Sequence, residues 1–202
     1  ISYVYMWYRD GGVAPAATGG RVEPDSTAKG ESWRVVVIPS DGEASGMSAE
    51  ATVTIGNTAP NAPSISLSPS PPRTSDTLLV SIDTPADDPD GDPVEYRFSW
   101  TVDGDSAGIT DSFVDSSLTR RGEIWSVTVI ANDGELESSP VTRTAVIENS
   151  TPTLAGVTLS PPSATVEDVL LCEAIDPFDA DGDGVELTYS WQIGSFTIDA
   201  AG

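Results

Sequence analysis

The sequence predicts an all-β protein built of tandem β-sandwich repeats, and two observations support this. First, the segment KGESWRVVVIPSDGE (29–43) returns as RGEIWSVTVIANDGE (121–135), and DDPDGDPVEYRFSWTV (87–102) returns as FDADGDGVELTYSWQI (178–193). A period of about 92 residues is typical of an array of small domains. Second, short stretches of alternating apolar and polar residues lie between turn residues, with no sustained period of 3.6, so strands are expected.

The period divides the chain into three parts. Residues 61–152 form one complete repeat, residues 1–60 match the C-terminal part of a repeat, and residues 153–202 match the N-terminal part of another. A chain cut out of phase with its repeat leaves apolar strands unpaired at both ends. We therefore expect it to be a stretch of a longer repetitive protein, or to be completed by neighbouring identical chains.

Five of the strands expected in the complete repeat can be located in the sequence, and they cover residues 64–68, 77–83, 94–102, 124–131 and 141–147. In the third of them, Tyr96, Phe98 and Trp100 share one face, which is the pattern of a half-buried strand. About seven short strands in such a length, with turns every 8 to 12 residues, indicate an immunoglobulin-like sandwich. The recurring tryptophans occupy apolar positions and are expected in the cores: Trp7, Trp33, Trp100, Trp125 and Trp191.

Two short joints separate the repeats, NTAPNAP (57–63) and NSTPT (149–153). They contain proline and are too short to act as flexible Gly/Ser linkers. The expected fold is therefore a set of tandem immunoglobulin-like β-sandwich repeats of about 92 residues arranged as a rod.

The succession DPDGDPVEYRFSWTVDG, RGEIWSVTVIANDGE and VIENSTP resembles the immunoglobulin-like repeats of bacterial and archaeal surface proteins, related to polycystic-kidney-disease and cadherin-like modules. The resemblance covers essentially the whole chain. It departs from a typical polycystic-kidney-disease repeat after Trp100, where Thr101, Val102 and Asp103 stand in place of a GDG turn. The resemblance implies stalks, spacers and adhesive arrays outside the cell, many of which bind calcium.

Composition limits the classes of function. The chain has 32 acidic and 9 basic residues and a net charge of −23, which argues against nucleic acid as a partner because phosphate binding needs clustered cations. It contains no stretch apolar enough for a membrane span. With no histidine and one cysteine, it lacks Ser-His and Cys-His catalytic pairs, so we expect no enzyme.

Two aspartate clusters are the candidate metal sites. The first comprises Asp87, Asp88, Asp90 and Asp92, and its counterpart comprises Asp179, Asp181 and Asp183. Carboxylates at alternate positions of a tight turn can converge, and calcium takes six to eight oxygen ligands. The alternative is that aspartate and glycine serve only the turn, which they favour for backbone reasons. Four aspartates in six residues, recurring in the next repeat, favour Ca²⁺.

The sandwich topology adds residues to each cluster. The turn between the second and third strands and the turn between the last two strands lie at one end, where the chain also enters from the preceding repeat. We therefore expect Asp133 and Asn57 near the first cluster and Asn149 near the second, so that calcium would stiffen each joint. For Asp41 and Asp133, each in a DGE hairpin, the turn interpretation is favoured unless the side chain faces the loop.

These features predict a structural component of an extracellular filament, sheath or adhesin stalk at the cell surface, built of calcium-stiffened repeats. The alternative is an accessory array of a secreted enzyme, with carbohydrate as its candidate ligand. The expected partners are further repeats of the same protein or neighbouring identical chains, and a surface or glycan ligand. Met6 and Tyr8 lie opposite the expected core face and form a candidate contact patch.

Overall fold

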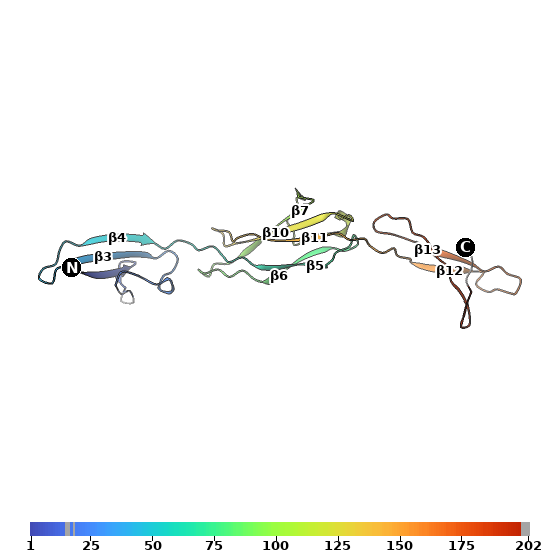
Figure 1. The fold of residues 1–202 in the computed structure, drawn as a ribbon, viewed down its shortest axis with the longest axis horizontal. Helices are drawn as coiled ribbons and strands as arrows, with labels where there is room; N and C mark the ends of the chain where they lie inside the picture. The colour runs from blue at the N-terminus through green and yellow to red at the C-terminus, as the bar shows by residue number, and fades with distance from the viewer. Residues whose placement is uncertain (15–16, 18, 199–202) are drawn as a thin grey trace. The chain divides into compact units, whose positions relative to one another are not determined.

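The computed structural model describes residues 1–14, 17 and 19–198, and nearly all of its regular structure is β-strand (Figure 1). The chain divides into two compact units. Unit 1 comprises Ile1–Ile65, Ile82–Phe98 and Thr128–Thr142, and unit 2 comprises Ser66–Ser81, Ser99–Val127 and Arg143–Gly202. The boundaries fall inside strands of residues 61–152, the complete repeat of the sequence, which is called the central repeat below and contributes residues to both units. Within the described residues, no helix is long and apolar enough to cross a membrane.

Unit 1 contains a four-stranded antiparallel sheet in the order β2-β1-β3-β4. Its strands are β1 (Ser2–Arg9), β2 (Gly12–Val13), β3 (Ser32–Ser40) and β4 (Ala49–Thr54), and the short 3-10 helix η1 (Pro24–Ser26) precedes β3. Asp10 and Gly11 connect β1 to β2 with φ angles of 51° and 81°, which is the two-residue hairpin turn that Asp-Gly favours.

The central repeat is an immunoglobulin-like β-sandwich of two sheets, β5-β6-β9 and β11-β10-β7-β8. The first sheet consists of β5 (Ser64–Ser68), β6 (Leu78–Thr84) and β9 (Phe113–Val114). The second consists of β7 (Glu95–Val102), β8 (Asp105–Ser106), β10 (Ile124–Asn132) and β11 (Val141–Val146), and the 3-10 helix η2 covers Ser116–Leu118. The predicted all-β sandwich is confirmed, and the five expected strands begin and end within one or two residues of the observed ones.

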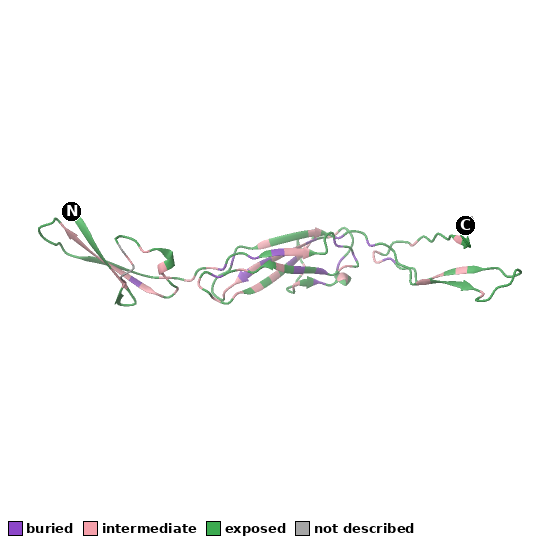
Figure 2. Ribbon diagram, turned by 90° about the horizontal axis from the view of Figure 1, so that it is seen from below, coloured by how far each residue is buried: buried purple, intermediate pink, exposed green. Residues whose placement is uncertain are grey.

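The core follows from the alternation along the strands. On β10, Trp125, Val127, Val129 and Ala131 are buried while the residues between them are not (Figure 2). Unit 2 also buries Leu78, Trp100, Val114 and Ile147, and unit 1 buries Trp33 and Ile65. Each buried Val, Leu or Ile side chain contributes about 1.5–3 kcal/mol by leaving water.

Four of the tryptophans form two pairs of like geometry. Trp7 and Trp33 meet edge-to-face with ring centroids 6.3 Å apart, and Trp100 and Trp125 do the same at 6.3 Å. Trp33, Trp100 and Trp125 are buried, as expected for core residues, whereas Trp7 and Trp191 are half-buried. The two pairs, whose members are 26 and 25 residues apart in the sequence, therefore share one ring geometry.

Residues 153–198 contribute two antiparallel hairpins to unit 2. Strands β12 (Gly156–Ser160) and β13 (Leu171–Ile175) form one, and β14 (Trp191–Ile193) and β15 (Phe196–Ile198) form the other. In the first hairpin Val157 faces Ala174 and Leu159 faces Cys172.

Candidate cation site at the aspartate loops

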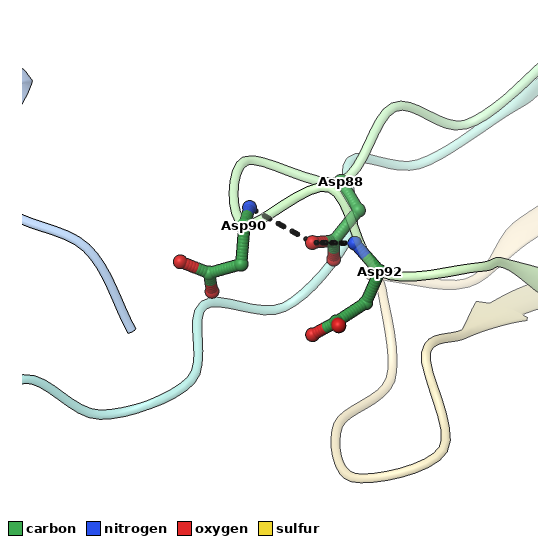
Figure 3. A group of neighbouring side chains, drawn as sticks. All are labelled: Asp88, Asp90 and Asp92. Atoms are coloured by element: carbon green, nitrogen blue, oxygen red, sulfur yellow. Dashed lines mark hydrogen bonds between the residues drawn. The ribbon is translucent and has the colours of Figure 1, made fainter. Parts of the chain in front are cut away.

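The first aspartate of each cluster folds its own loop. Asp88 Oδ1 accepts hydrogen bonds from the amides of Asp90 (2.9 Å) and Asp92 (3.2 Å), as Figure 3 shows. Asp179 Oδ1 accepts the same pair of bonds from Asp181 (2.9 Å) and Asp183 (3.2 Å). Gly91 and Gly182 have φ angles of 79° and 78°, a conformation that favours glycine. The two loops therefore share one backbone geometry.

The first loop brings three carboxylates together. Asp88, Asp90 and Asp92 each offer one oxygen, and these oxygens lie within 4.8 Å of one another (Figure 3). It is the only such acidic group among the residues that the structure describes. Asp88 is 8% exposed, whereas Asp90 and Asp92 are half-buried. Asp87 is exposed and outside this group, and its main-chain oxygen accepts a bond from the amide of Asn61 at 2.9 Å.

Two buried oxygens in this region have no hydrogen-bond partner. They are Asp88 Oδ2 and Asn57 Oδ1. A buried polar atom without a partner costs about 1–3 kcal/mol, and more if it is charged, so such atoms are rare in native proteins, and a bound ion or a water can satisfy them. The carboxylate of Asp88 uses one oxygen to shape the loop and leaves the other without a donor.

The linker that follows β4 is bound to the same region. The amide of Thr58 donates to Asp90 Oδ2 at 2.6 Å, and Asn57 Nδ2 donates to Asp133 Oδ2 at 2.7 Å. Asp133 Oδ1 accepts from the amides of Leu136 and Glu135, and the bond from Leu136 is the main cause that lowers the pKa of Asp133. Asp133 therefore accepts hydrogen bonds both from its own turn and from the linker. The described hydrogen bonds to Asp41 Oδ1 come from two amides of its own turn, those of Glu43 and Ala44.

A basic side chain also reaches the first loop. Lys29 Nζ lies 2.7 Å from Asp92 Oδ2 and 2.8 Å from Glu135 Oε1. Hydrogen bonds to Asp92, and then to Glu135, raise the pKa of Lys29 above its usual value. Neither Lys29 nor Glu135 was among the predicted site residues. The sequence does show that a basic residue recurs here, because Lys29 in KGESW occupies the position of Arg121 in RGEIW.

The second loop repeats these contacts with different partners. The amide of Ser150 donates to Asp181 Oδ2 at 2.7 Å, and Thr74 Oγ1 donates to Asp181 Oδ1. The bond from Thr74 is the main cause that lowers the pKa of Asp181. Arg121 forms an ion pair with Asp183 and also donates to Asn149 Oδ1. Asp179 is 8% exposed, like Asp88.

The predicted residues thus fall into two sets. The first joins the Asp88 loop to Asp133 and Asn57 in unit 1, and the second joins the Asp179 loop to Asn149 in unit 2. In the second set Asp181 and Asp183 already have donors from Thr74, Ser150 and Arg121. The first set has the closer carboxylates and the two oxygens without partners, so it is the better candidate for a bound cation.

The chain is similar to solved structures of other proteins. A segment of two fibronectin type-III domains from chicken tenascin is similar to this chain, with 18% sequence identity and a TM-score of 0.31, and the match covers 71% of this chain and 83% of that one. No protein-family model matches the chain. A search of curated proteins likewise found no match.

Proposed function

We propose that this chain is part of an extracellular or cell-surface structural protein, such as a filament, sheath or adhesin stalk, in which calcium stiffens the joints between immunoglobulin-like repeats. The observation that carries the proposal is the pair of buried oxygens without partners, Asp88 Oδ2 and Asn57 Oδ1, in the region of the Asp88 carboxylate group. A cation bound at this carboxylate group would satisfy Asp88 Oδ2 and offset the repulsion between the carboxylates.

The ligand chemistry favours calcium among the common ions. Candidate ligands are Asp88 Oδ2, one oxygen each of Asp90 and Asp92, and Asn57 Oδ1. These are hard oxygen donors, and calcium accepts six to eight of them in a flexible geometry, with water filling the remaining positions. Zinc prefers nitrogen and sulfur, and the chain has no histidine and one cysteine.

The position of the site accounts for its proposed role. Asn57 and Thr58 belong to the linker after β4, and the Asp88 loop belongs to the following repeat, directly before β7. A cation held by both would restrain the linker and favour an extended array, which suits a stalk or filament. At the second loop, competing donors on Asp181 and Asp183 would make binding weaker.

Thermal unfolding of the full chain with and without calcium tests this function. Calcium at about 2 mM, compared with a chelator at equal ionic strength, should raise the melting midpoint by a few degrees, because extracellular modules bind calcium at about 10⁻⁴–10⁻³ M and binding stabilises the folded form. Asp88→Asn keeps an oxygen for the loop amides but removes the charge, so it should abolish most of the shift.

Asp41→Asn is the matched control, since Asp41 has the same type of turn bonds without the cluster. It should leave the calcium shift intact, and magnesium should give a smaller shift than calcium. Equal midpoints in calcium and chelator, or an unchanged shift in Asp88→Asn, would contradict the calcium proposal.

A further inference from the structure

The basic residue of the RGE or KGE turn is held in the same way in two successive repeats. Before β3, the amide of Gly30 donates to the carbonyl of Ile55 (2.9 Å), and the amide of Ile55 donates to the carbonyl of Glu31 (2.9 Å). Before β10, Gly122 and Ile147 make the matching bond at 2.8 Å, and Ile147 and Glu123 make the other at 3.0 Å. These bonds fix the basic residue beside the chain segment that leads into the linker.

A carboxylate of the same turn makes it more rigid. Glu31 Oε2 accepts from the amide of Ala28 and from the indole of the buried Trp33, both at 2.9 Å. Glu123 Oε2 accepts from the amide of Arg120 and from the indole of Trp125, also at 2.9 Å. The turn that carries the basic residue is therefore tied to the core tryptophan of its repeat in both copies.

Each basic side chain then reaches the last aspartate of the next loop. Lys29 contacts Asp92 at 2.7 Å, and Arg121 contacts Asp183. In both places the linker amide contacts the middle aspartate of the same loop, Thr58 to Asp90 and Ser150 to Asp181. Two contacts from one repeat thus fix two aspartates of the following loop. The chain has only 9 basic residues against 32 acidic ones. A basic residue at both position 29 and position 121 is therefore not expected from the composition alone.

We infer that each aspartate loop is a docking surface for one basic side chain of the preceding repeat, so that Lys29 and Arg121 are ionic latches that hold successive repeats together. The partner that this surface fits is a repeat carrying a basic residue directly before its Gly-Glu turn. The inference rests on the repeat array of the proposed function but not on its calcium, because the latch contacts involve only side chains of the protein.

The two latches differ in chemistry. The Lys29 ammonium is shared between Asp92 and Glu135, whereas the planar Arg121 guanidinium contacts both oxygens of Asp183 and the side-chain oxygen of Asn149. Arginine is suited to such paired contacts, and lysine acts as a point charge. In the first loop, the latch occupies Asp92 Oδ2 and leaves Asp88 Oδ2 without a partner.

Hydrogen exchange of the full chain in a chelator tests the latches. The amides of Thr58 and Ser150 report each joint directly, because both donate to loop aspartates. Lys29→Gln should speed exchange in residues 57–62 by up to about five-fold, the range expected for loss of a partly exposed ion pair, and leave residues 149–154 unchanged. Arg121→Gln should do the reverse, and Lys29→Arg should retain protection.

Arg97→Gln is the control, since Arg97 pairs with Glu137 inside one repeat. It should change neither joint. The inference is overturned if Lys29→Gln behaves like Arg97→Gln, or if either latch variant speeds exchange equally at both joints. Because calcium is absent throughout, failure of the latch and failure of the calcium proposal are separate results.

Discussion

Leu78 and Leu79 are neighbours on β6 with opposite environments: Leu78 is fully buried and Leu79 is 46% exposed. Successive side chains of a strand point to opposite faces, so one belongs to the core and the other to solvent. Leu78→Ala should destabilise the chain by about 2–5 kcal/mol, because it removes apolar contacts and leaves a cavity. Leu79→Ala should cost less than about 0.5 kcal/mol.

Urea unfolding followed by tryptophan fluorescence measures both effects, since Trp100 and Trp125 belong to the same repeat as β6. Similar losses in the two variants would mean that the core face of β6 has been assigned to the wrong side.

At the same scale, sequence patterns could identify which residues are buried but not how polar atoms are paired. Alternation alone marks Trp100, Trp125 and Val127 as core residues, and they are buried. By contrast, the partnerless Oδ2 of Asp88 depends on the torsion of one side chain within its loop. No spacing in the sequence encodes that orientation, so the strongest observation for a cation emerges only from the structure.

The backbone of each aspartate loop sets the positions of its carboxylates. In the Asp179 loop, the two glycines differ in backbone conformation. Gly182 has a φ of 78°, and Gly184 in the same loop does not lie in that region, with no neighbouring atom within 4 Å of an added Cβ. Gly182→Ala should therefore cost about 1–2 kcal/mol, because an L-residue is strained at positive φ. Gly184→Ala should be neutral or slightly stabilising, because it lowers the entropy of the unfolded chain.

Exchange of the Asp181 and Asp183 amides, which both donate to Asp179, reports the loop directly. It should become faster in Gly182→Ala and remain unchanged in Gly184→Ala. Equal exchange in these two variants would argue against a loop geometry that requires glycine at position 182.

The longer strands could be predicted from the sequence, whereas the shortest could not. The expected strand at 64–68 is β5, and the expected strand at 77–83 is displaced by one residue from β6 (Leu78–Thr84). The two-residue strands β8 and β9 were not predicted, because two residues cannot show alternation. The contacts of Lys29 and Arg121 were not predicted, because a basic residue that recurs with the same period does not show which carboxylate it meets.

Over the whole molecule, charge is strongly unbalanced. The chain carries 32 acidic and 9 basic residues, and residues 153–202 contain no basic residue at all. Like charges at this density destabilise a compact state by mutual repulsion, and salt screens that repulsion over about 10 Å at 0.1 M. The same salt weakens the ion pairs of Lys29 and Arg121, so the two effects oppose each other.

Repulsion should prevail, because acidic residues outnumber basic ones more than threefold and exposed ion pairs each contribute at most about 1 kcal/mol. In a chelator at pH 7, raising NaCl from about 20 to about 500 mM should increase the melting midpoint by several degrees, measured by calorimetry. Near pH 4 many carboxylates are protonated, so the same salt increase should give a smaller shift. A midpoint that falls as salt rises would contradict this prediction and would mean that the ion pairs contribute more to stability than the repulsion removes.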